Sequence, residues 1–127
     1  MINNLKISEN FLLSEFQSPD TKEVKINSDL VIKLQELRKQ ISQPLKINSA
    51  YRTSEHNAAV GGSPKSQHLK GNAVDISMRN MKGITVDEFA NIAERIGFDG
   101  IGKYHTFVHL DVRGYRARWD GRGEVRR

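Results

Sequence analysis

The chain has 127 residues, of which 37% are hydrophobic and 28% charged, proportions typical of one globular domain. It contains no cysteine, which excludes a disulfide framework, a thiolate zinc site and a cysteine nucleophile. The formal net charge is +5, concentrated in the segment 113–127 with its six arginines and two acidic residues, so we expect a basic C-terminal tail that binds an anionic polymer or only aids solubility.

The first half of the chain predicts one long helix and one strand. Residues 11–16 form an apolar cluster, typical of a short helical turn. A helix is expected over residues 29–43, with Asn27 or Ser28 as its N-cap. Its apolar stripe consists of Leu30, Leu34, Leu37 and Ile41. Residues 45–49 alternate between apolar and polar side chains and predict a strand.

The second half predicts short helices mixed with strands. Residues 54–60 could form one or two helical turns, and residues 72–77 predict a strand. A capping box at 85–88 opens a helix that ends at Gly97, and residues 106–112 predict a further strand. The connections are too irregular for repeated βαβ units. We therefore expect an α+β fold with a small antiparallel sheet flanked by helices.

Two of the predicted strands carry a metal-binding residue type among apolar neighbours. Asp75 interrupts the first strand and His109 interrupts the second, where an uncompensated charge would be costly. If the two strands pair, the Cβ atoms of these residues can lie about 5 Å apart. His68 lies seven residues before Asp75, on the loop that enters the strand, and can fold back over it.

Two imidazoles and one carboxylate are a ligand set that suits catalytic zinc, with the fourth position left for water. Zinc lowers the pKa of such a water to about 7 and polarises a carbonyl oxygen. The spacing alone leaves an alternative open, in which the histidine caps a turn and the aspartate is hydrogen-bonded within one.

Several motifs occur in order along the chain. Residues 66–76 (SQHLKGNAVDI) contain the pattern S-x-H-x-x-G-x-A-x-D, and residues 107–111 read FVHLD. Both runs resemble the metal motifs of the zinc D-alanyl-D-alanine carboxypeptidases, a family that includes murein endopeptidases, many of them from bacteriophages. Shorter similar runs are residues 11–16 (FLLSEF), 47–53 (INSAYRT) and 57–62 (NAAVGG). The resemblance covers most of the chain, from about residue 10 to residue 119.

The resemblance implies the Hedgehog/DD-peptidase fold, one zinc ion bound by His68, Asp75 and His109, and cleavage of peptide bonds in the peptidoglycan stem. It also implies that Arg52 binds substrate and stabilises developing charge, because a planar guanidinium can hold a carboxylate or a polarised carbonyl. Ser66 is expected to orient the His68 loop or to hydrogen-bond the substrate.

The chain departs from the family at the catalytic base. Several branches carry a glutamate or histidine two or three residues before the last zinc ligand, where this chain has Phe107 and Thr106. Neither can accept a proton as a general base. His105 and Asp111 are the nearest candidates, since a regular strand would place both on the same face as His109. The alternatives are that His105 is an exposed loop histidine and that Asp111 hydrogen-bonds a ligand histidine from behind.

We therefore expect a single zinc peptidase domain over residues 1–127, with the tail at about 113–127. It would hydrolyse stem peptides through a zinc-activated water, either as a D,D-carboxypeptidase or as an endopeptidase of the L-alanyl-D-glutamate type. With no visible secretory signal, it would be made in the cytoplasm and act at the bacterial cell wall, as phage or prophage lysins do. We expect a monomer without membrane helices.

Two alternatives remain open from the sequence. The first is a non-catalytic zinc-binding module of the same fold that binds cell wall. The second is a basic nucleic-acid binder, a less favoured partner class because it would use the arginines and have no need of His68, Asp75 and His109.

Overall fold

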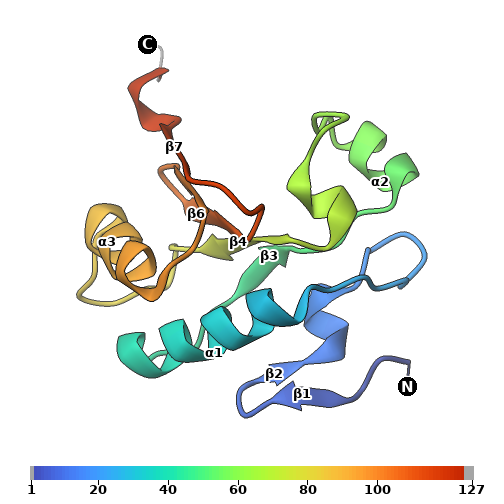
Figure 1. The fold of residues 1–127 in the computed structure, drawn as a ribbon, viewed down its shortest axis with the longest axis horizontal. Coiled ribbons are helices and arrows are strands. Elements are labelled where there is room, and N and C mark those ends of the chain that lie inside the picture. The colour runs from blue at the N-terminus through green and yellow to red at the C-terminus, as the bar shows by residue number, and fades with distance from the viewer. Residues whose placement is uncertain (1, 125–127) are drawn as a thin grey trace.

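The computed structural model describes residues 2–124 (Figure 1). The helices are α1 (Ser28–Ile41), α2 (Ser54–Ala59) and α3 (Val86–Ile96). The strands are β1 (Lys6–Ser8), β2 (Phe11–Leu12), β3 (Ile47–Ser49), β4 (Ala73–Ser77), β5 (Gly100–Lys103), β6 (Phe107–Asp111) and β7 (Ala117–Asp120). The 3-10 turns are η1 (Leu13–Phe16), η2 (Gln67–Lys70) and η3 (Arg122–Glu124).

Five strands form one sheet in the order β3-β4-β6-β5-β7, and β1 pairs with β2 in a separate ribbon. Every pair in the larger sheet is antiparallel except β5 with β7, which is parallel. The parallel pair arises because the chain leaves β6 on one side of β5 and re-enters the sheet on the other side after a short loop. The α+β fold class is confirmed, with a mixed rather than purely antiparallel sheet.

The segment predicted as a basic tail is largely part of the folded domain. β7 pairs along its whole length with β5, η3 follows it, and only residues 125–127 lie outside the described part. Arg116 and Arg118 lie 2.6 and 2.9 Å from the carboxylate oxygens of Glu94, and Arg122 lies 2.8 Å from those of Asp87 and Asp120. Acidic partners therefore offset much of the positive charge that the sequence concentrates there.

The hydrophobic core lies between the sheet and helices α1 and α3. The predicted stripe of α1 is buried as expected, and the inward residues of the sheet come from alternate positions of β4, β5 and β6. These inward residues are Val74, Ile76, Ile101, Val108 and Leu110. Because side chains alternate across a strand, the residues between them must point to the other face. No helix among residues 2–124 is long and apolar enough to cross a membrane.

The predicted caps fix the helix ends. The Asn27 side chain accepts a hydrogen bond from the backbone N–H of Asp29 at the start of α1. Thr85 and Glu88 form the capping box of α3, which Gly97 ends in the left-handed conformation. Helix α1 stops at Ile41, two residues before the predicted end, because Ser42 already adopts a left-handed conformation.

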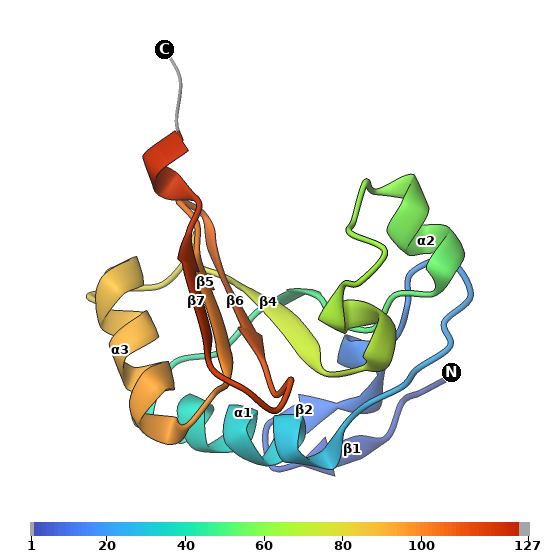
Figure 2. The same ribbon diagram turned by 45° about the horizontal axis from the view of Figure 1, so that its top comes forward.

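Figure 2 shows how the remaining elements sit around the face opposite the core. Helices α1 and α3 cover the core face, while α2 and the loop after it stand apart from β5, β6 and β7. β4 and η2 lie between these two parts of the chain. Within residues 2–124, no helix covers the polar face of the sheet.

Candidate active site

A row of paired residues crosses the polar face of the sheet. Asp75 on β4 pairs with His109 on β6, and Ser49 on β3 pairs with Asp75. On the other side, Gly102 on β5 pairs with His109, and Trp119 on β7 pairs with Gly102. Since directly paired residues share one face of a sheet, strands far apart in sequence bring these side chains into one line.

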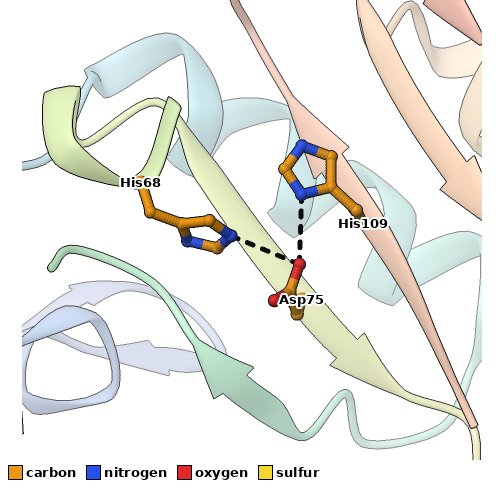
Figure 3. A group of neighbouring side chains, drawn as sticks. All are labelled: His68, Asp75 and His109. Atoms are coloured by element: carbon orange, nitrogen blue, oxygen red, sulfur yellow. Dashed lines mark hydrogen bonds and ion pairs between the residues drawn. The ribbon is translucent and has the colours of Figure 1, made fainter. Parts of the chain in front are cut away.

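His68, Asp75 and His109 meet at the centre of this row, as the sequence predicted (Figure 3). The Nε2 atom of His68 lies 3.3 Å from Oδ1 of Asp75, and Nδ1 of His109 lies 3.1 Å from the same oxygen. One potential ligand atom from each residue lies within 4.8 Å of the others. The three side chains are therefore close enough to hold a single metal ion.

The 3-10 turn η2 presents His68 to this cluster. Ser66 caps the turn by accepting a hydrogen bond from the backbone N–H of His68. Gly71 ends the turn with φ +71°, and a Cβ atom there would lie 2.3 Å from the carbonyl oxygen of Lys25. The ring is fixed by its Nδ1 atom, 2.6 Å from the carbonyl oxygen of Ala50. A carbonyl can only accept, so Nδ1 carries a proton.

His109 is oriented by a carboxylate beneath it. Its Nε2 atom lies 2.7 Å from Oδ2 of Asp111, whose side chain is fully buried. Arg113 holds that carboxylate through hydrogen bonds from Nε and Nη2. A Cβ atom at Gly100 would come within 2.2 Å of it, so glycine on β5 makes the room. The ionised Asp111 accepts, and Nε2 of His109 therefore carries the proton.

These two orientations leave three acceptors facing one another. His68 directs the lone pair of Nε2 at Asp75, and His109 directs the lone pair of Nδ1 at the same oxygen. In the neutral histidines neither atom has a hydrogen to donate to the carboxylate. Such a set is satisfied by a cation, and two imidazoles with one carboxylate match the nitrogen and oxygen preference of zinc. The residues present therefore fit the metal.

Protons can substitute for a cation in this cluster. Burial by itself lowers the pKa of His109, but hydrogen bonds with Asp111 and Asp75 outweigh burial and raise it. Burial raises the pKa of Asp75, yet hydrogen bonds with His109 and His68 hold it well below its usual range. The carboxylate is thus ionised at neutral pH, and a proton on His109 competes with a metal ion for the Nδ1 atom of that ring.

Arg52 lies beside the cluster on the strand-to-helix connection after β3. Its Nε atom donates to Oγ of Ser49 at 3.1 Å, and its Nη1 atom donates to Oδ1 of Asn57, also at 3.1 Å. Its Nη2 atom lies 3.7 Å from Oδ2 of Asp75. The side chain lines the cleft and keeps further N–H groups with which it could bind a substrate.

A cleft of about 510 Å³ opens over the cluster. One wall carries polar residues, among them Arg52, Lys65 and Ser66, and the other wall is made mainly by Tyr104, Phe107 and Trp119. A larger hollow of about 660 Å³ runs along β3 and η1 but contains none of the three clustered residues. The chemistry therefore identifies the smaller cleft as the candidate site.

The two residues predicted as catalytic bases do not line this cleft. His105 lies in the turn between β5 and β6 with an exposed side chain, because β6 begins only at Phe107. Asp111 lies beneath His109, and both of its oxygens are engaged by His109 and Arg113. The proton-carrier roles predicted from the sequence stay untested predictions; the geometry favours a positioning role for Asp111 and places His105 outside the cleft lining.

Sequence reasoning missed the residues that support the site from other elements. Asn57, on the six-residue helix α2, is only 3% exposed and accepts a hydrogen bond from Arg52. Its burial marks it as a supporting residue, but burial at this position follows from the fold and cannot be read from the sequence. Ser49 is paired with Asp75 through the sheet register. The wall residue Trp119 is on β7, a strand that the sequence pattern did not indicate.

Comparison with protein families supports this arrangement. The chain matches the family model described as Peptidase M15 over residues 4–111. The matched stretch contains Arg52, His68, Asp75, His109 and Asp111, and it ends before β7 begins. No curated protein matches the chain in sequence.

Proposed function

Because the chain belongs to the peptidase M15 family of zinc-dependent metallopeptidases, we propose that it hydrolyses peptide bonds in the peptide stem of peptidoglycan. The observation that carries this proposal is the convergence of His68, Asp75 and His109, with the lone pairs of two differently anchored imidazoles directed at one carboxylate oxygen. Three ligands at the base of an open cleft leave room for a substrate.

In this proposal His68, Asp75 and His109 hold one zinc ion. When bound there, zinc supplies a Lewis acid that polarises the scissile carbonyl and makes a water acidic enough to attack it at neutral pH. The Ala50 carbonyl and Asp111 keep the two imidazoles in the tautomers that leave the converging nitrogens unprotonated. These contacts orient the ligands before any ion arrives.

Arg52 acts on the substrate. Its guanidinium is held by Ser49 and Asn57 next to Asp75, where it can donate to a substrate carboxylate or to the oxygen that gains charge during hydrolysis. Ser66 caps η2 with its hydroxyl and also lines the cleft, so it can offer a further hydrogen bond to the peptide.

Two finer assignments belong to the same proposal. The enzyme is either a D,D-carboxypeptidase or an endopeptidase that cuts after the first stem residue. We also propose that it acts as a monomer at the bacterial cell wall in the manner of a phage or prophage lysin. The ion pairs of Arg116, Arg118 and Arg122 argue against nucleic acid as a partner, since these side chains already have acidic partners.

A second candidate function is a zinc-binding module that binds cell wall without cutting it. One observation favours it: among the described residues that line the cleft, Asp75 is the only acidic side chain. A zinc peptidase commonly uses a separate carboxylate or histidine to move protons. The two candidates agree on zinc binding and differ only in turnover.

The decisive experiment incubates the protein with purified peptidoglycan, with and without a chelator, and identifies released peptides by mass. We expect products that disappear with the chelator and return when zinc is added. The variant His68→Ala should lose both zinc and products, whereas His56→Ala, a histidine on α2 that does not line the cleft, should keep both. Stoichiometric zinc without any product would select the binding module.

A further inference from the structure

Three aromatic side chains, Tyr104, Phe107 and Trp119, form the wall of the cleft next to His109 and are called the aromatic wall here. The rings of Tyr104 and Phe107 stack with centroids 4.3 Å apart and an interplanar angle of 7°. The indole Nε1 of Trp119 donates to the Tyr104 hydroxyl at 2.7 Å. The Trp119 ring lies 5.1 Å from the His109 ring. The wall thus reaches the proposed metal ligands.

Two glycines that contact the aromatic wall, Gly102 and Gly121, leave room for its rings. A Cβ atom at Gly102 would lie 2.3 Å from the indole of Trp119, and one at Gly121 would lie 2.6 Å from the ring of Tyr104. The indole can therefore lie directly over β5 only because position 102 has no side chain. The rings are held by these close approaches, by the hydrogen bond between Trp119 and Tyr104, and by the Arg113 guanidinium, which lies 5.3 Å from the centre of the Trp119 ring.

The facing wall has a different character. It is polar and carries Arg52 and Lys65, and Lys65 is exposed and forms no ion pair among the described residues. A stem peptide built from alanine, glutamate and a diamino acid suits that polar wall and offers the aromatic wall only methyl groups and short methylene chains. The extended apolar surface in peptidoglycan is the C–H face of its pyranose rings, and aromatic rings with polar handles suit such a surface.

We propose that the aromatic wall binds the sugar ring to which the peptide stem is attached, so that the enzyme cuts close to the glycan. This inference rests on the proposed function for the identity of the substrate. An extended residue spans about 3.5 Å, so the terminal D-alanine bond, four residues from the sugar, lies roughly 14 Å away from it. The bond after the first alanine is within reach of a metal cluster that borders Trp119. The endopeptidase assignment follows.

Binding can be tested without hydrolysis, because Trp119 is the single tryptophan of the chain. The zinc-loaded protein is titrated with N-acetylmuramoyl-L-alanine and with lactoyl-L-alanine, the same fragment without the sugar, while tryptophan fluorescence is recorded. We expect a saturable change with both, and affinity for the sugar-bearing fragment tighter by roughly tenfold, the scale of one aromatic contact plus its burial. Equal affinities would overturn the proposal.

Turnover provides the second test, on stem peptides with and without the muramoyl sugar. Trp119→Ala should lower kcat/KM for the sugar-bearing peptide by roughly tenfold more than for the sugar-free peptide. Trp119→Phe, which keeps an aromatic ring, should recover part of the loss. Ile32→Ala removes a large apolar side chain of α1 that is 66% exposed and does not line the cleft, and it should change neither rate.

The outcomes separate this inference from the proposed function. Equal losses on both peptides would mean that Trp119 serves His109 rather than a sugar, and release of terminal D-alanine as the main product would also overturn the inference. If no peptide is cut at all, the proposed function fails, and the fluorescence comparison still decides whether the wall binds sugar.

Discussion

His68 and His109 present different ring nitrogens to the same oxygen of Asp75, Nε2 from one and Nδ1 from the other. The choice of nitrogen is made by what holds the opposite side of each ring, a backbone carbonyl for His68 and a buried carboxylate for His109. Asp111 matters most here, because it is charged, fully buried and shared with Arg113. The orientation of the two candidate histidine ligands thus depends on the Ala50 carbonyl and on Asp111, neither of which lines the cleft.

Asp111→Asn should weaken zinc binding by about 10- to 100-fold, the range typical for loss of a partner behind a metal-binding histidine. The amide has almost the same shape but no charge, so it stabilises the ring less and leaves Arg113 without its anion. Competition with a chromophoric chelator measures the affinity. Asp120→Asn, on the exposed part of β7, is the matched control. An unchanged affinity in the first variant would show that the carboxylate is dispensable.

The role of His105 can be decided with one variant. Its side chain is exposed in the β5–β6 turn and does not line the cleft, so we expect His105→Ala to keep near-native turnover of peptidoglycan peptides. Loss of a general base normally lowers the rate by about 10²- to 10⁴-fold. A loss on that scale at unchanged zinc content would instead establish His105 as the proton carrier.

At the scale of elements, the site depends on a single 3-10 turn fixed at both ends. η2 has only four residues, which is too few for intrinsic stability, and the Ser66 cap and the left-handed Gly71 define where it starts and stops. The backbone of Gly71 also packs against the carbonyl of Lys25 before α1. The position of His68 therefore depends on a contact with a distant part of the chain.

Gly71→Ala should destabilise the fold and weaken zinc binding together. A side chain at φ +71° is strained, and its Cβ would lie 2.3 Å from a backbone oxygen that cannot move freely. We expect a loss of about 2–4 kcal/mol in the free energy of unfolding, measured by urea titration. Gly83→Ala is the matched control, because Gly83 has φ +73° with open space around it and should cost only about 1 kcal/mol. Equal losses would mean that the Lys25 contact adds nothing.

At the scale of the whole molecule, the proposed metal links β4, β6 and η2, which are joined otherwise by a short sheet and by the packing of η2. A ligand that binds only the folded state stabilises it in proportion to its occupancy. The three converging acceptors are also stabilised by a cation placed between them. The metal should therefore contribute to folding as well as to chemistry.

Removing zinc should lower the melting temperature. At a free zinc concentration of 100 times Kd, the stabilisation is about 2.7 kcal/mol, which corresponds to roughly 10 °C for a chain of this length. Scanning calorimetry with zinc and with excess chelator measures the shift. Asp75→Asn should show almost no difference between the two conditions, and a large zinc effect in that variant would place the metal elsewhere.

The sequence by itself determined helices α1 and α3, strands β3, β4 and β6, and the residue types of the candidate ligands. Helical spacing gave α1, the capping box gave α3, and charged residues inside apolar strands marked Asp75 and His109, because these signals are local and follow from the alternation of exposed and buried positions. The tertiary structure decided what no local pattern encodes: the pairing of β7 with β5, the room that Gly100 and Gly102 leave, and the burial of Asp111. Short strands with mixed residues, such as β7, show little hydrophobic periodicity. Their position in the sheet, and with it the position of the aromatic wall, therefore depends on the strands with which they pair.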